Sequence, residues 1–279
     1  MDADQQKSQT SGESTVRCFV SKSTFTYSIV IPAWNESHHI RKTINVLHKA
    51  QSQMQLEARA RALPNFTGDI IVVDNNSTDD TAAIAKELGT TVIFEPVNQI
   101  AKARNTGAAA SNADFIIFLD ADTNINATLL RLTLEKLARG EVIGGGSTLT
   151  FDREIKGYAK IMVNLWNWWS VKIRAAAGCY VFCTKEAFSA VGGFDESHYA
   201  AEELVLSKKL RRYAKNNTKK FIIIADAPVV SSARKLDWYS RKQKIIQLVL
   251  LLIPGATRSR KMLGMWYDRS HITDKQQSK

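Results

Sequence analysis

Two aspartates, Asp120 and Asp122, directly follow the apolar run 115–119 and are separated by a single alanine. Because side chains repeat every two residues along a strand, both carboxylates would face the same side at the strand's end. Paired carboxylate oxygens suit a hard cation, and Mg²⁺ or Mn²⁺ is commonly shared between protein carboxylates and phosphate oxygens. The pair therefore favours a nucleotide-type substrate held through a metal. The alternative is that a short acidic pair only ends a strand and solvates a turn.

Polar residues also follow two other apolar runs. Asn35 and Glu36 come after the first run, and the segment from Asp74 to Ser77 comes after the second. In open α/β sheets, ligands bind in the crevice at the carboxyl ends of the strands. We therefore expect these residues and the Asp120 pair to lie at one edge of a sheet.

The elements that must position these side chains are short β-rich runs that alternate with longer segments of helical period. This alternation predicts an α/β fold with a mainly parallel, Rossmann-like central sheet flanked by helices on both faces. The predicted strands span residues 27–33, 69–74, 91–95, 114–120, 178–184 and 220–225. The predicted helices span residues 36–61, 79–88, 100–110 and 128–139.

The second half of the chain is less regular. Three consecutive glycines, 144–146, interrupt an apolar stretch and favour a bend or bulge over a phosphate cradle. Trp166, Trp168 and Trp169 follow on an expected helix, and we interpret them as core residues. The alternatives are that they line an apolar acceptor groove or touch lipid headgroups.

The chain has 279 residues, 44% of them hydrophobic and 23% charged, which fits one large globular domain or two closely packed ones. Its three cysteines, Cys18, Cys179 and Cys183, are too few for a disulfide framework, and we expect reduced thiols. Residues 1–26 are polar and lack the basic start and apolar core of a secretion signal. We therefore expect a cytoplasmic protein with a disordered N-terminal tail over residues 1–26.

The net charge of +11 is concentrated near the C-terminus, where residues 234–279 contain eleven Lys or Arg and three Asp. The apolar run 245–253 is too short to cross a bilayer, which needs about 20 residues. Aromatic and basic residues flank this run, so the segment 238–267 suits an anionic membrane surface. A helix that closes an acceptor domain or forms a dimer contact is the open alternative. The segment lacks the interleaved aromatics of a nucleic-acid site, so we expect no specific nucleic-acid partner.

Five segments in this order resemble the inverting family-2 glycosyltransferases, which have the nucleotide-sugar-binding GT-A fold. The resemblance runs from about residue 27 to residue 225. It is carried by residues 28–36, 70–81 and 103–107, by the Asp120 pair, and by residues 191–196 followed by 201–204. The order and spacing of all five segments make the resemblance specific, whereas one segment alone would be weak.

The resemblance implies a nucleotide-sugar site and a metal site, with Mn²⁺ or Mg²⁺ as the cofactor. The residues implied for the nucleotide sugar are Pro32, Asn35, Glu36, Asp74, Arg104, Asn105, Asp120 and Asp122. Of these, Asp122 and Asp120 form the implied metal site: Asp122 would bind the ion directly, and Asp120 would contact the ribose side and the metal region. A third protein ligand is not evident, although His198 or His271 could supply one.

The family places its catalytic base in an acidic pair, usually Glu-Asp, at the start of a helix. This chain has Glu202-Glu203, so Glu203 takes the position of the base. The glutamate side chain at this position is longer than the family's usual aspartate. Because of this departure, Glu202 stays as the alternative base. A carboxylate within hydrogen-bond reach of the acceptor hydroxyl is sufficient for this role. The alternative for both acids is stabilisation of the helix dipole.

The resemblance divides the chain into a nucleotide-sugar-binding half, 27–130, an acceptor-binding and catalytic-base half, 131–231, and a basic amphipathic segment, 232–279. It implies a metal-dependent inverting glycosyltransferase that moves a sugar, expected to be UDP-linked, to a hydroxyl on a glycan or lipid-linked carrier, as in polysaccharide biosynthesis. A polyprenyl-phosphate glycosyl synthase is the first alternative. A sugar nucleotidyltransferase is disfavoured because the turn 32–36 is not the Gly-rich basic loop of that class. A non-enzymatic basic binding module is the third alternative to this function. Localisation would be cytoplasmic, or peripheral on the inner face of the membrane.

Overall fold

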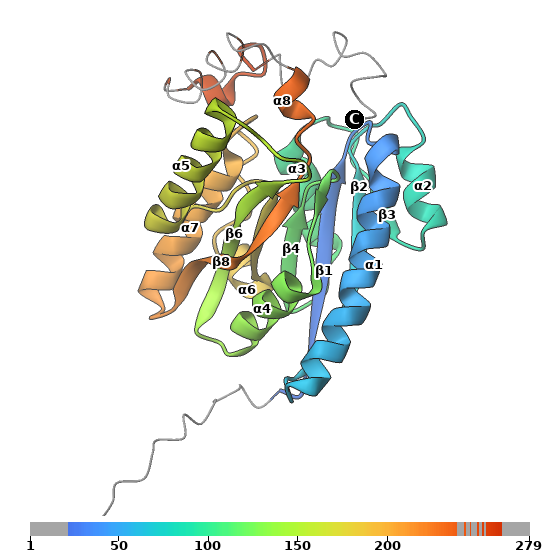
Figure 1. Ribbon diagram of the computed structural model, residues 1–279, viewed down its shortest axis with the longest axis vertical. Helices are drawn as coiled ribbons and strands as arrows, with labels where there is room; N and C mark the ends of the chain where they lie inside the picture. Colours follow the sequence, from blue (N-terminus) through green and yellow to red (C-terminus); the bar gives the residue numbers. More distant parts are fainter. Residues whose placement is uncertain are drawn as a thin grey trace, which may run out of the picture.

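The computed structural model describes residues 22–238 and 255–263, together with residues 243, 246, 250 and 253 (Figure 1). Its described strands form one sheet in the order β3-β2-β1-β4-β7-β6-β8-β5. The strands are β1 (Thr24–Ala33), β2 (Asn65–Asp74), β3 (Thr91–Phe94), β4 (Phe115–Leu119), β5 (Thr123–Asn124), β6 (Val142–Phe151), β7 (Tyr180–Thr184) and β8 (Lys220–Ser231).

The helices connect the strands and cover the sheet. They are α1 (Ser37–Ala60), α2 (Thr81–Glu87), α3 (Ile100–Ala110), α4 (Ala127–Ala138), α5 (Tyr158–Ile173), α6 (Lys185–Ala190), α7 (Glu202–Asn216) and α8 (Lys235–Trp238), with a 3₁₀ turn at Ala256–Arg258. Every helix expected from the sequence is present, with bounds that differ from the prediction by two residues or fewer. None of the described helices has the length and apolar character needed to cross a membrane.

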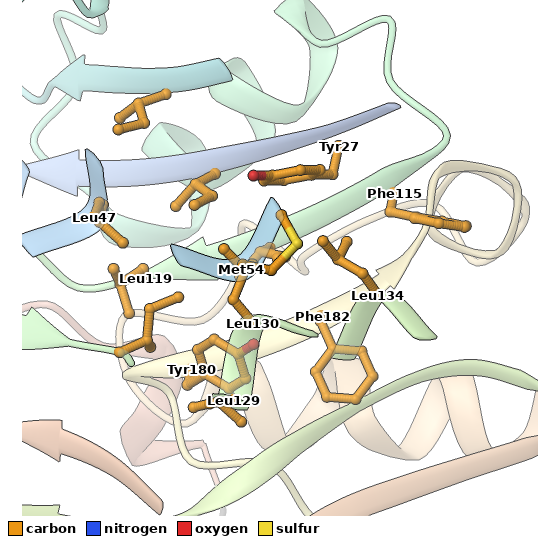
Figure 2. Close-up of a cluster of buried hydrophobic side chains, with 14 of the residues drawn as sticks. Tyr27, Leu47, Met54, Phe115, Leu119, Leu129, Leu130, Leu134, Tyr180 and Phe182 are labelled. Atoms are coloured by element: carbon orange, nitrogen blue, oxygen red, sulfur yellow. The ribbon is translucent and has the colours of Figure 1, made fainter. Parts of the chain in front are cut away.

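Two hydrophobic clusters lie on opposite faces of the sheet. The alternation along β1 separates them, because Ile29 and Ile31 belong to one cluster and Val30 belongs to the other. Helices α1 and α4 pack on the first face, and α3, α6 and α7 pack on the second. Figure 2 shows part of the first cluster, where Leu47 and Met54 of α1 lie among side chains of β4, β7 and α4. The prediction of helices on both faces is therefore confirmed.

The sheet is mostly parallel. β1 pairs in parallel with β2 and β4, β2 pairs with β3, and β6 pairs with β8. Strand β7 runs antiparallel to both of its neighbours, β4 and β6. The strands on either side of β7 therefore point the same way. As a result, the carboxyl ends of β1, β2, β4, β6 and β8 share one edge of the sheet.

Strand β6 was not among the predicted strands, because its three glycines weaken the strand pattern. The sequence interpretation of a bend or bulge at these glycines is partly right, since the register of β6 on β8 shifts between Val142 and Gly144. Yet the glycines lie within the strand and permit close packing. A side chain at Gly145 would overlap the carbonyl oxygen of Ile222 on β8.

Two other expectations about the chain can be compared with the structure. Residues 24–26, expected in the N-terminal tail, lie in β1, whereas residues 1–21 are outside the described part. Cys179 and Cys183 are reduced cysteines as predicted, and Cys18 is outside the described residues. Most of the segment 238–267 is also outside them, apart from 238, 243, 246, 250, 253 and 255–263.

The interpretation of the tryptophans of α5 as core residues is wrong for two of the three. Trp168 and Trp169 are exposed, and Trp166 is partly buried and packs against Trp169 with ring centroids 5.4 Å apart. The physical reason is that α5 lies at the outside of the molecule, with only Ser170 of its residues buried (Figure 1).

Candidate active site

The loops after β1 and β2 are joined to each other by side chains of the predicted nucleotide-binding residues. Asn35 has a positive φ of 52°, and its Oδ1 accepts a hydrogen bond from the Thr78 backbone N–H at 2.8 Å. The Asn35 N–H donates to Ser77 Oγ at 3.1 Å, and Asp74 Oδ1 accepts from the Ser77 N–H at 2.9 Å. Asn tolerates the left-handed conformation better than most residues, which explains its place in this turn.

Arg104 of α3 connects three separate parts of the chain. Its Nη2 donates to Asp120 Oδ1 at 2.9 Å and to the Gly178 carbonyl at 2.7 Å, and its Nη1 donates to Glu202 Oε1 at 2.6 Å. The guanidinium is fully buried. Burial alone would lower the pKa of Arg104, but the carboxylates of Asp120 and Glu202 outweigh this effect and raise it. The sequence named Arg104, Asp120 and Glu202, and the structure brings all three together.

The acidic pair at the start of α7 divides into two different environments. Ala201, with a positive φ of 59°, precedes the helix, and Glu202 turns inward to Arg104. Glu203 is partly buried beside Gly178, where a side chain at the glycine would lie 3.2 Å from Glu203 Cδ. Burial and the negative charge of Glu202 raise the pKa of Glu203 to about 8, against the opposing effect of Arg104.

Arg234, three residues after the end of β8, binds two of the other predicted carboxylates, Glu36 and Asp122, and was not predicted from the sequence. Its Nη2 lies 2.6 Å from Glu36 Oε2 and 2.9 Å from Asp122 Oδ2, and its Nε donates to the same Asp122 oxygen at 3.1 Å. The guanidinium also lies 4.9 Å from the centre of the Trp238 ring. Burial alone would lower the pKa of Arg234, but Glu36 and Asp122 raise it. The strand predicted here ended at residue 225, whereas β8 continues to Ser231, so Arg234 did not stand out as a residue that follows a strand.

His39 is the last member of the cluster around Arg234, just as Asp120 and Glu202 form the cluster around Arg104. Burial and the positive charge of Arg234 lower the pKa of His39 to about 4, so the ring is neutral near pH 7. Since arginine can only donate, His39 Nδ1 accepts the hydrogen bond from Arg234 Nη1 at 3.1 Å. The histidine therefore orients the guanidinium without adding charge.

Three further predicted residues lie as follows. Pro32 is partly buried near the end of β1, beside Val73 of β2. Asn105 fixes the backbone of Phe194, because its Oδ1 accepts from the Phe194 N–H and its Nδ2 donates to the Phe194 carbonyl, both at 3.0 Å. His198 pairs with Asp195 at 3.3 Å, whereas His271 is outside the described residues.

The carboxylates of these clusters are the candidates to hold a divalent cation. No three or more His, Cys, Asp or Glu in the described part of the chain are grouped as a metal site. Mg²⁺ and Mn²⁺ need only one or two protein carboxylates when phosphate oxygens and water complete the shell. Asp120 fits this pattern, since its side chain is 20% exposed, whereas Oδ2 of the buried Asp122 already accepts from Arg234. The clusters hold four carboxylates and two arginines, a negative excess that suits a divalent cation.

This mainly parallel sheet, with acidic side chains at the carboxyl ends of its strands, has the α/β fold called GT-A, as the match to solved structures shows. The solved mannosyltransferase PcManGT of Pyrobaculum calidifontis, in complex with GDP-Man and Mn²⁺, matches with a TM-score of 0.60 at 18% identity, over 81% of this chain and 61% of that one. Residues 1–349 of S. aureus TarS in complex with UDP-GlcNAc match with a TM-score of 0.56 at 16% identity, over 88% of this chain and 72% of that one.

The sequence comparisons give the family. The glycosyl transferase family 2 profile matches residues 28–191, more than half of the chain, and the chain belongs to this family. Glycosyltransferase AglE of Haloferax volcanii is 26% identical over 132 residues, which are 44% of this chain and 40% of that protein. An uncharacterized glycosyltransferase of Rickettsia typhi is 40% identical over 77 residues, 26% of each chain. The matches thus span less than half the length of these relatives.

Proposed function

We propose that this protein is a metal-dependent inverting glycosyltransferase that moves a sugar from a UDP-linked donor to a hydroxyl of a glycan or lipid-linked acceptor. The observation that carries the proposal is the pair of acids at the start of α7. Glu202 is bound to Arg104, while no ion pair among the described residues holds Glu203, whose pKa is raised to about 8. A carboxylate with a pKa near the working pH is a suitable general base.

In the proposed reaction, Glu203 takes the proton of the acceptor hydroxyl while that oxygen attacks the anomeric carbon. The bond between this carbon and the diphosphate oxygen breaks on the opposite face, so the configuration inverts. Gly178 leaves room for the base, since a larger residue there would press on the Glu203 carboxyl group. Glu202 holds Arg104, and Arg104 in turn holds Asp120 at the end of β4.

The departing nucleoside diphosphate needs positive charge. Asp120, the more exposed aspartate, would hold Mn²⁺ or Mg²⁺, while Asp122, the ligand expected from the resemblance, lies beside it bound to Arg234. The ion would supply a Lewis acid to the diphosphate when bound. PcManGT was solved with Mn²⁺, as was the glucosyl-3-phosphoglycerate synthase of Mycobacterium tuberculosis, whose TM-score is 0.52 at 20% identity. These neighbours support the proposed cofactor. Arg104 is buried against Asp120 and keeps its positive charge beside the proposed diphosphate position.

The nucleoside would lie against the turns after β1 and β2. Asp74 and Glu36 are carboxylates that can accept hydrogen bonds from a ribose diol or from a pyrimidine N–H. The bonds of Asn35 and Asp74 to residues 77 and 78 support a preformed wall at this position. A preformed wall keeps the entropy cost of donor binding low.

A cavity of about 660 Å³ lies beside the end of β6 and the start of α5. Its lining holds two basic residues, Arg153 and Lys160, two acidic residues, Asp152 and Glu154, and apolar residues such as Leu149. Because these charges balance, the cavity does not favour the alternative in which the acceptor is a polyprenyl phosphate.

The test is a thermal-shift panel of nucleoside diphosphates with and without Mn²⁺. A ligand at 100 times its dissociation constant stabilises the folded state by about 2.7 kcal/mol, so a specific nucleotide is readily seen. We expect UDP with Mn²⁺ to give the largest shift. Stabilisation by no nucleotide would contradict the proposed function. Release of pyrophosphate from a nucleoside triphosphate and a sugar phosphate would favour a nucleotidyltransferase instead.

A further inference from the structure

Helix α5 carries a stripe of exposed apolar side chains along its whole length. The stripe consists of Tyr158, Ile161, Leu165, Trp168 and Trp169, all of them more than one third exposed. These positions follow the spacing i, i+3, i+7, i+10 and i+11, which places them on one face of a helix. A large exposed apolar surface on a protein commonly marks a site of interaction with another protein or with a membrane.

The stripe faces outward because the opposite side of α5 is fixed to the sheet. The Asn167 side chain accepts from the Leu149 backbone N–H at 2.9 Å and donates to the Leu149 carbonyl at 2.8 Å. These two bonds hold the helix on β6. At about 1.5 Å per residue, the 16 residues of α5 present a rod of roughly 24 Å at the outside of the molecule (Figure 1).

The charges on helix α5 itself are basic. The helix contains Lys160 and Lys172 and no acidic residue, and the exposed Arg174 follows it. Before the helix, the exposed Lys156 lies 3.5 Å from Glu154. The chain's own apolar run, 245–253, is bordered by lysines and arginines. It is therefore a poor electrostatic match for α5, and an anionic partner suits both segments. The stripe with its basic border has the composition of a helix that lies in a membrane interface.

We propose that α5 lies flat on the surface of an anionic lipid bilayer, with the apolar stripe at the boundary between headgroups and acyl chains. The residues of this surface are separate in sequence from the segment 238–267, for which the sequence predicts the same kind of partner. Residues 174–177 lead from α5 to Gly178, which contacts Glu203. A membrane-bound α5 would therefore hold the proposed base close to an acceptor carried by the lipid phase.

The experiment uses the full-length chain and vesicles of phosphatidylcholine with or without phosphatidylglycerol. The test variant is Ile161→Ser with Trp168→Ser, whose native side chains are 65% and 59% exposed. The matched control is Leu56→Ser with Phe94→Ser, at 66% and 59% exposed on α1 and β3. We expect the test variant to lower the partition coefficient on anionic vesicles about tenfold or more, and the control to leave it within about twofold.

Brominated lipid adds a positional readout, since it should quench wild-type fluorescence more strongly than that of Trp168→Phe. Binding that survives in the test variant, or that is equal on vesicles without phosphatidylglycerol, would overturn the proposal. So would a wild-type dimer that the test variant dissociates, because the stripe would then face a second copy. A fall in unfolding midpoint confined to the test variant would show that the chain itself covers the stripe.

Discussion

Replacing Glu203 with glutamine separates the two candidate bases from each other. Burial and the neighbouring Glu202 raise the pKa of Glu203 from 4.5 to about 8, so the neutral form is favoured in the folded protein. Glutamine has nearly the shape of that neutral form but cannot take a proton. We therefore expect Glu203→Gln to abolish sugar transfer while the protein remains folded.

The same substitution should change how stability depends on pH. Between pH 4.5 and about 8, the folded state holds the Glu203 proton and the unfolded state has lost it, so wild-type stability falls as pH rises through this window. One pKa unit corresponds to about 1.4 kcal/mol, so the rise in the pKa of Glu203 from 4.5 to about 8 corresponds to roughly 5 kcal/mol of unfolding free energy. Because Glu203 is partly exposed, screening reduces this figure, and we expect Glu203→Gln to gain about 1–2 kcal/mol at pH 9 and nothing at pH 4.

The measurements are denaturant unfolding at pH 4 and pH 9 and sugar transfer across the same range. The matched control is Glu202→Gln, which breaks a buried ion pair of 2.6 Å with Arg104 and should cost roughly 3 kcal/mol at pH 9. Wild-type kcat should rise with pH up to about 8, as Glu203 ionises. Near-wild-type transfer by Glu203→Gln, or an unchanged pH dependence of its stability, would refute the reasoning.

Four further substitutions test the site, a control ion pair outside it, and the packing of the sheet. Arg234→Met removes the cation shared by two buried carboxylates and should lower stability by roughly 3–5 kcal/mol in urea unfolding and weaken nucleotide binding. Arg131→Met, which breaks a similar bridge between two glutamates outside the site, should destabilise without changing nucleotide affinity. Gly178→Ala places a methyl group 3.2 Å from Glu203 Cδ and should lower kcat while costing less than about 1 kcal/mol. Gly145→Ala should cost about 1–3 kcal/mol through overlap with the neighbouring strand, as seen in the thermal midpoint.

Local patterns in the sequence were sufficient for much of the fold. Helix α3 begins and ends at the predicted residues, β3 differs from the prediction by one residue at one end, and α1 and α4 differ by one residue at each end. Apolar periodicity reports how a segment buries one face, and this depends on near neighbours in the chain. Strand β6 was missed because its glycines have low strand propensity, and close packing against β8 favours them there.

The sequence alone determined the class of this protein, because five segments match family-2 glycosyltransferases in order and spacing, and the family profile matches residues 28–191. It also named both candidate bases. Only the tertiary structure decided which carboxylate each arginine holds. Arg234 meets Asp122 across 112 residues and Glu36 across 198, distances over which no local periodicity carries information. The two glutamates of α7 likewise differ only in the neighbours that the fold supplies, since Glu202 meets a guanidinium and Glu203 a glycine.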